Sequence, residues 1–245
     1  VKHIGDCAFD NTQMTFEISK ESKLTYIGYR AFADNYNGQS TIYLSSKVEY
    51  VGSWAFTTSC FTIYCEAERR PSSWDVKWLG ENSYKPTVIW GVTRYESGQT
   101  VDGIKYRIVN DTVFIIGYVG ELKDIVIPNE IEGLTVKEIS RYAFSNSEIV
   151  SVILPNTLIR IGDYAFNNCD SLTSITIPAS VAEIGDYAFN NCSSLTSLTI
   201  EEGSVLEYIG SYAFSVYSLK GHLVIPNTVK HIGDCAFDNT QMTFE

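Results

Sequence analysis

The sequence predicts a strand-rich α/β solenoid, in which parallel strands alternate with short helical or 3₁₀ turns, and three observations point to it. The phrase aliphatic-Gly-x-x-Ala-Phe, with its Gly replaced once, occurs eight times, as at residues 4–9 and 184–189. With one exception, its phenylalanines recur at a nearly constant interval of roughly 23 residues, the length of a solenoid turn. A short alternating run with β-branched residues follows most copies, which is typical of a strand. One such unit cannot bury its own apolar face, whereas stacked copies can.

The repeated phrase is expected to form a single helical or 3₁₀ turn, with its Ala and Phe inward and its Asp, Ser or Arg outward. The alternative is a ligand or cofactor box, which eight copies at solenoid spacing disfavour. We therefore expect one aligned stack of buried rings. The stack comprises Phe9, Phe32, Phe56, Phe144, Phe166, Phe189, Phe214 and Phe237.

The alternating runs between the phrases are the expected strands. Several of them end at a proline, which cannot donate a hydrogen bond to a neighbouring strand and so marks a strand end. The predicted strands cover residues 14–18, 41–44, 61–65, 125–127, 151–154, 174–177, 197–200 and 222–225.

The repeat pattern is interrupted between Phe56 and Phe144. Three of the four tryptophans, Trp74, Trp78 and Trp90, fall in this gap. A stacked array needs its ends covered, so we interpret residues 57–91 as a Trp-rich closing cap over Ile63 and Cys65, which ends the repeats of residues 1–56. An aromatic platform for carbohydrate is the alternative.

Residues 92–133 are expected to form a second module, which opens the next array. Two apolar runs, residues 106–109 and 113–116, flank Asn110, Asp111 and Thr112, a pattern that predicts a β-hairpin. Residues 134–245 then carry the remaining repeats.

Residues 1–17 and 229–245 are identical, so the sequence that begins at position 1 begins again at position 229. Ordinary solenoid repeats diverge, and the other copies here agree only at key positions. The identity predicts a longer tandem protein of near-identical units, each as long as residues 1–228, which could form a filament. The alternatives are a periodic filament unit with overlapping ends and an engineered duplication. If the protein is a tandem array, residues 1–17 and 229–245 should adopt the same conformation. Residues 26–32 of the following unit should then cover Phe244.

The phrase at residues 161–178 resembles the BspA-like type of leucine-rich repeat. Residues 102–106 and 127–133 are similar to the opening segment of bacterial members, and residues 65–91 to their closing segment. The resemblance covers essentially the whole chain and implies a leucine-rich-repeat solenoid on a secreted or surface-attached protein. It also implies adhesion, with a host or neighbouring-cell protein or glycan as partner. The family shares no catalytic residues, so none is assigned.

Composition and motifs favour no catalytic, cofactor or metal site. The net charge of −11 disfavours nucleic acid, which needs clustered Lys and Arg. No apolar run is long enough for a membrane-spanning segment. His3, His222 and His231 are the only histidines, without a metal-binding or hydrolase spacing.

The cysteines and sequons favour structural roles. Cys169 and Cys192 occupy equivalent turn positions, where buried thiols are expected to bond neighbouring backbone. Cys60 and Cys65 could form a local disulfide if their Cα separation permits it. Asn110 and Asn191 begin N-glycosylation sequons.

The predicted function is thus a non-catalytic, extracellular, structural or adhesive repeat protein whose partners include further copies of itself. The alternative is a protein- or glycan-binding module that uses the strand face. Alternate outward residues of that face would form a row comprising Tyr43, Tyr64, Thr176 and Thr199.

Overall fold

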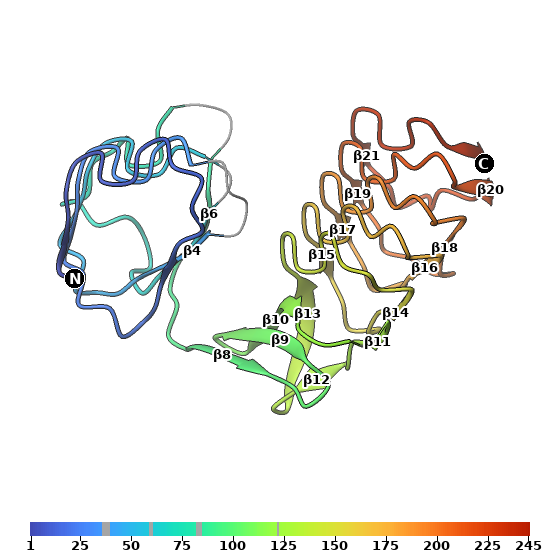
Figure 1. Ribbon diagram of the computed structural model, residues 1–245, viewed down its shortest axis with the longest axis horizontal. Helices are drawn as coiled ribbons and strands as arrows, with labels where there is room; N and C mark the ends of the chain where they lie inside the picture. Colours follow the sequence, from blue (N-terminus) through green and yellow to red (C-terminus); the bar gives the residue numbers. More distant parts are fainter. Residues whose placement is uncertain (36–39, 59–60, 82–84, 122) are drawn as a thin grey trace. The chain divides into compact units, whose positions relative to one another are not determined.

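The chain folds into two compact units, Val1–Tyr95 and Glu96–Glu245. The computed structural model describes residues 1–35, 40–58, 61–81, 85–121 and 123–245. Figure 1 shows both units as stacked coils of chain. The first unit includes Tyr95, because this ring packs on Tyr43 and Tyr64.

The second unit is a stack of coils whose parallel strands form two rows. Each turn of the coil contributes a two-residue or longer strand to a first row, in the order β13 (Leu134–Ile139), β15 (Arg160–Ile161), β17 (Glu183–Ile184), β19 (Tyr208–Ile209) and β21 (His231–Ile232). The second row holds the pairs β11 (Asp124–Val126) with β14 (Ser151–Ile153), β16 (Ser174–Ile177) with β18 (Ser197–Ile200), and β20 (Lys220–Leu223) with β22 (Gln241–Phe244).

An antiparallel hairpin begins the second unit. It joins β9 (Ile104–Val109) to β10 (Thr112–Tyr118) through Asn110 and Asp111, as the sequence predicted, and Asn110 adopts a left-handed φ of 55°. β8 (Tyr95–Gln99) lies beyond β9 in the same sheet, and β10 pairs in parallel with β13. β12 (Glu130–Ile131) pairs with β13. The hairpin therefore covers the first turn of this solenoid.

The first unit repeats the same plan with fewer turns. Its first row is β1 (His3–Ile4), β3 (Tyr26–Ile27) and β5 (Tyr50–Val51). Its second row is β2 (Glu17–Ile18), β4 (Ser40–Leu44), β6 (Phe61–Cys65) and β7 (Thr87–Ile89). All eight predicted strand runs are thus confirmed, with ends shifted by a few residues.

The expectation of helical turns is wrong: the described residues contain no helix. The residue before each Ala of the phrase instead takes a left-handed φ, for example 57° at Tyr187 and 55° at Tyr212. Hydrogen bonds between turns impose this conformation, since the N–H of Tyr187 donates to the carbonyl of Ser211 at 2.8 Å and that of Phe189 to Ala213 at 2.8 Å. Bonds to the next coil therefore alternate with bonds inside the turn, such as the one from the N–H of Asn190 to the carbonyl of Tyr187 at 3.2 Å.

The phenylalanines form two stacks, one in each unit, and not the single stack expected. Phe166, Phe189 and Phe214 are 0% exposed, and their rings lie parallel at 5.0 and 5.2 Å. In the first unit Phe32 stacks on Phe56 at 5.1 Å. Phe9 and Phe237, in the first and last turns described, are only half-buried. The interruption of the repeats between residues 56 and 144 separates the stacks.

Candidate binding surface

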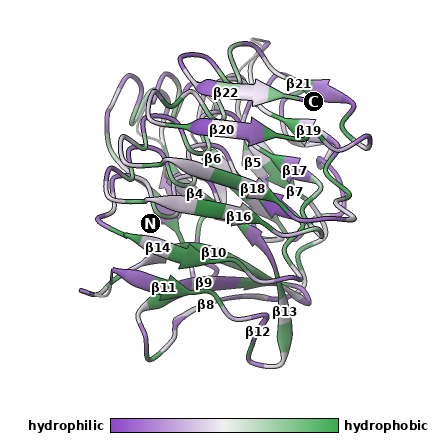
Figure 2. Ribbon diagram, turned by 90° about the vertical axis from the view of Figure 1, so that its right-hand side faces the viewer, coloured by the Kyte–Doolittle hydropathy of each residue, from purple (hydrophilic) through white to green (hydrophobic). Residues whose placement is uncertain are grey.

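The second row of strands in unit 2 presents an open face, and its central strands β14, β16 and β18 carry no charged outward residue. The exposed Asp124 and Lys220 lie on the flanking strands β11 and β20, and Asp124 accepts a hydrogen bond from Ser151 at 2.6 Å. Alternating residues of the row point inward to the core and outward to solvent, as in the exposed Thr176 and Thr199, which are direct neighbours in the register. Ile153 is 62% exposed and Val126, its register partner on β11, is 63% exposed. Figure 2 shows β14, β16, β18, β20 and β22 as successive rungs of this face. We call it the strand face; its outward residues on β14, β16 and β18 are Ser151, Ile153, Ser174, Thr176, Ser197 and Thr199.

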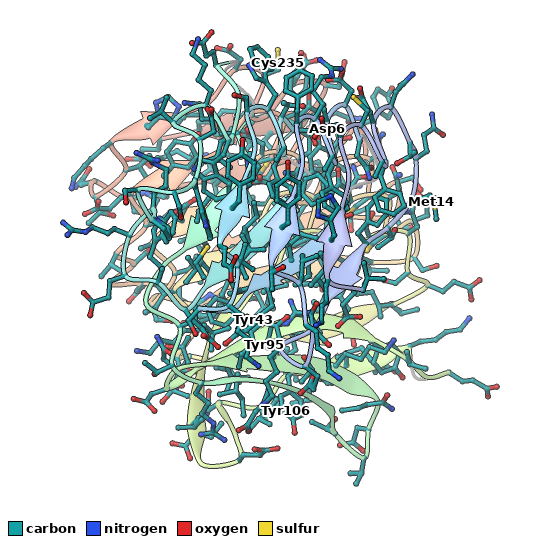
Figure 3. The ribbon with its side chains drawn as sticks, turned by 90° about the vertical axis from the view of Figure 1, so that its left-hand side faces the viewer. Asp6, Met14, Tyr43, Tyr95, Tyr106 and Cys235 are labelled. Carbon is teal, nitrogen blue, oxygen red and sulfur yellow. The ribbon has the colours of Figure 1, made fainter. Side chains whose placement is uncertain are left out.

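The equivalent face of unit 1 is covered, which corrects part of the predicted row. Tyr43 is 5% exposed and Tyr64 2% exposed, because the ring of Tyr95 packs on them at 4.7 and 5.1 Å. Figure 3 shows Tyr43 and Tyr95 side by side. Tyr43 also donates a hydrogen bond to Glu66 at 2.8 Å, and burial together with this bond raises the pKa of Tyr43. Only the Thr176 and Thr199 half of the row is open to a partner.

The tryptophans are packed into the core of unit 1. Trp74 is 2% exposed and Trp78 is 4% exposed. Trp78 meets Phe56 edge-on at 6.0 Å, and Trp90 packs on both other tryptophans. The indole N–H of Trp74 donates to the carbonyl of Val48 at 3.1 Å. Trp74 and Trp78 leave no free ring face on which a sugar could stack.

A ladder of tyrosines runs along the turns of unit 2. Tyr142, Tyr164, Tyr187 and Tyr212 stack at 4.7, 4.8 and 4.9 Å, and the Arg141 guanidinium lies over Tyr142 at 5.1 Å. Burial in the ladder raises the pKa of Tyr164 to about 12. Sugar recognition by aromatic residues needs a free ring face, and the inner rings have a neighbour on both faces. The ladder therefore holds turns together rather than offering a binding platform.

The buried cysteines also act between turns, as predicted. The thiols of Cys169 and Cys192 donate to the carbonyls of Phe144 and Phe166, each at 3.1 Å. The contact with Cys169 and burial raise the pKa of the Cys192 thiol. Burial raises the pKa of Cys65 to about 12, so this free thiol stays protonated and unreactive. Cys60, its suggested disulfide partner, lies outside the described residues.

One arginine joins three carboxylates on the first row of strands. Arg160 lies 3.1 Å from Glu138, 2.9 Å from Glu183 and 3.7 Å from Asp163. Burial raises the pKa of Glu138 although Arg160 opposes this shift. The group is fully paired, so its role is structural.

Arg160→Met is expected to destabilise unit 2 by about 2 kcal/mol at neutral pH, because it leaves the largely buried Glu138 without its counter-ion. Loss of the arginine raises the folded-state pKa of Glu138 further. The cost should therefore be full at neutral pH and fade below about pH 4.5, where the carboxylate is protonated in the unfolded state as well. Urea unfolding of the variant and of the unsubstituted chain between pH 4 and 8 measures this difference in the free energy of unfolding. Lys230→Met, which removes the exposed pair with Glu207, is the control and should change little; an equal cost at all pH values would contradict the assignment.

The described residues form no cluster suited to metal binding, and the hollow near β11 is smaller than the pockets typical for small molecules. No cluster of three His, Cys, Asp or Glu side chains suited to a metal ion occurs among the described residues. His222 hydrogen-bonds Thr243 at 3.1 Å and lies 3.4 Å from Glu245, near an exposed strand end. A hollow of about 160 Å³ beside Asp102 and Asp124 is smaller than a typical small-molecule site. Within the described residues, no helix has the length and apolarity to cross a bilayer.

The sequon residues lie at turns. Asn110 forms the hairpin turn described above, and Asn191 has an exposed side chain and a left-handed φ of 58°. Its N–H donates to the carbonyl of Ser215 at 3.3 Å, which is consistent with a structural role for its backbone.

Comparison with known proteins agrees with this geometry. The model of the BspA type leucine rich repeat region matches six copies, over residues 1–69 and 111–243. The leucine rich repeat protein of T. pallidum is 35% identical with a TM-score of 0.50, over 59% of this chain and 64% of that protein. The chain therefore aligns with less than two thirds of that relative.

A leucine rich cell surface protein of Faecalibacterium prausnitzii has a TM-score of 0.53 at 21% identity, over 99% of this chain and 77% of that protein. It shares the fold. No curated protein matches the chain. The repeated phrase, the two rows of strands and a family match over most of the sequence lead to one conclusion: the chain belongs to the BspA-type leucine-rich repeat family.

Proposed function

We propose that the chain is a non-catalytic, extracellular or cell-surface protein that adheres through the strand face of unit 2. The observation that carries the proposal is the open face itself. Its three central strands present six outward residues without a charge, among them the exposed Ile153. A row of parallel strands whose outward side chains are hydroxyls and aliphatic groups can take a protein or glycan surface without desolvating an ion on these strands.

The contrast between the two units supports this use. The same face in unit 1 is covered by Tyr95, so the open face of unit 2 is not a necessary consequence of the fold. Surface location is proposed from the family and matches the description of the F. prausnitzii protein as a cell surface protein.

Attachment of beads coated with the chain to host or neighbouring bacterial cells tests the proposal. The double variant Thr176→Glu, Thr199→Glu places two charges on the strand face at exposed positions, so the fold should persist while attachment falls about tenfold. Ser194→Glu adds a charge at an exposed turn beside the face and should leave attachment unchanged. Equal attachment of all variants, or none by the unsubstituted chain, would rule the proposal out. A glycan array and a protein ligand blot then distinguish the two ligand classes.

A further inference from the structure

Residues 3–12 and 231–240 have the same conformation. The φ angles are 54° at Cys7 and 55° at Cys235. The ring of Phe9 lies 4.8 Å from Phe16, and that of Phe237 lies 5.0 Å from Phe244. Thr12 and Thr240 donate to the carbonyl three residues earlier at 3.0 and 2.9 Å. The agreement extends from the first-row strand through the turn. Residues 241–244 are strand where 13–16 are not, because β20 pairs with them.

The two copies are covered on opposite faces. On the first, the following turn stacks Tyr26 on His3 at 4.1 Å and Phe32 on Phe9 at 5.3 Å. The N–H groups of Cys7, Phe9 and Asn11 then donate to the carbonyls of Tyr29, Ala31 and Ala33 at 2.8 to 2.9 Å.

On the second copy, the preceding turn stacks Tyr208 on His231 at 4.7 Å and Phe214 on Phe237 at 5.5 Å. The N–H of Gly233 donates to the carbonyl of Ile209 at 2.8 Å. One sequence therefore accepts a neighbouring coil on both faces, with compatible geometry.

The outer face of the second copy exposes apolar side chains and backbone N–H groups without a backbone acceptor in the described part of the chain. Ile232 is 46% exposed and Phe244 is 47% exposed. The N–H groups of Cys235, Phe237 and Asn239 have no backbone acceptor among the described residues, whereas their counterparts in the first copy are all bonded. An open coil of this kind is a template for another turn of chain.

We infer that a second copy of residues 18–44 covers this face, as it covers residues 1–17, and that it comes from the next unit of a tandem polypeptide. Gly28 permits the approach, because a Cβ there would clash with the Asp6 carboxylate, and Asp234 repeats Asp6. The N–H of Tyr29, which donates to Asp6 at 2.7 Å, then donates to Asp234.

The join merges unit 2 of one copy with unit 1 of the next into one solenoid. It begins at the hairpin of residues 104–118 and ends at the Trp74, Trp78 and Trp90 cluster of the next copy. The phenylalanine stack continues from Phe214 through Phe237 to Phe32 and Phe56. The two units of this chain thus belong to successive solenoids, joined at residues 95 and 96, in an array whose repeating unit has the length of residues 1–228.

Thiol labelling of a tandem protein tests the junction. Residues 1–245 are followed directly by a second copy of residues 18–245, and Ile232→Cys is placed in the first copy only. The exposed thiols of Cys7 and Cys235 are removed by Cys7→Ser and Cys235→Ser in every protein compared, and labelling at position 232 is read by peptide mass spectrometry. In the single chain the introduced thiol should react readily. In the tandem it should lie under Ile27 of the second copy and react more slowly by about tenfold or more. The control Val224→Cys replaces a side chain that is 58% exposed, and its thiol should react equally in both proteins.

A second tandem protein provides the blocked control. Two complete chains of residues 1–245 are joined by a Gly/Ser linker. In this protein residues 18–44 of the second copy already pack on residues 1–17 of that same copy, so they are not available to cover residues 229–245 of the first copy. The thiol introduced at position 232 should then react as it does in the single chain. Equal labelling of this thiol in the single chain and the direct tandem, or equal protection in the direct and blocked tandems, would overturn the inference. The experiment does not measure adhesion, so either result leaves the proposed function to its own test.

Discussion

Phe189→Ala is expected to lower the free energy of unfolding of unit 2 by about 3–5 kcal/mol. The side chain is 0% exposed, with Phe166 at 5.0 Å on one face and Phe214 at 5.2 Å on the other. Truncation removes both stacking contacts and leaves a cavity that the bonded turns cannot close, because the N–H of Phe189 holds the carbonyl of Ala213 at 2.8 Å. Guanidinium unfolding followed by circular dichroism measures the change.

Phe237→Ala is the matched control for this prediction. Phe237 occupies the same position of the repeat in the last turn described, where it is half-buried and has Phe214 at 5.5 Å on one side of the stack. Its truncation should cost about 1–2 kcal/mol, since less apolar area leaves water. Similar costs for the two variants would show that stacking between turns does not hold the solenoid together.

Gly210→Ala is expected to destabilise unit 2 by about 3 kcal/mol, because there is no room for a methyl group between the coils. A Cβ at Gly210 would lie 2.5 Å from the backbone nitrogen of Asp186 and 2.5 Å from the carbonyl carbon of Gly185. Relief would require the adjacent turns to separate. The loss would include the hydrogen bond from the Gly210 N–H to the carbonyl of Ile184 at 2.8 Å. Urea unfolding of the variant beside the unsubstituted chain measures the change.

Gly5→Ala tests whether the effect comes from the neighbouring coil. Gly5 occupies the same position of the phrase in the first turn, and a Cβ there would meet nothing within 4 Å. The substitution should leave the unfolding midpoint of the chain nearly unchanged. A comparable loss at both glycines would instead point to the backbone conformation of the phrase, and the proposed clash would be wrong.

The strands could be predicted from the sequence because their signal is local and repeated. Alternation places Ile175 and Leu198 inward and Thr176 and Thr199 outward, and the structure agrees at all four positions. The hairpin was equally predictable, since two apolar runs flank a short polar turn at Asn110. In each case the residues that specify the element lie within it.

The turn conformation could not be predicted in this way. Tyr187 and Trp54 are not residues that favour a left-handed φ, yet both adopt one. Hydrogen bonds to the next coil hold them there, such as the one from the N–H of Trp54 to the carbonyl of Lys77 at 2.8 Å. A partner about a turn away is invisible to local propensity.

The exposed part of the candidate surface likewise depended on distant contacts. Tyr43 and Thr176 occupy similar outward strand positions, but Tyr43 is buried because a segment far along the chain returns to place Tyr95 on it. The division of the ring stack also depended on the tertiary structure, because Phe56 and Phe144 lie in different compact units.

By itself the sequence determined the family, the repeat length, the strand positions and the identity of the two end segments. These properties follow from periodicity and exact repetition, which can be read along the chain. Only the tertiary structure decided which aromatic rings are covered, how the turns are bonded and which faces of the identical segments remain open. These depend on contacts between coils, and burial of a residue is set by what packs against it rather than by its sequence neighbours.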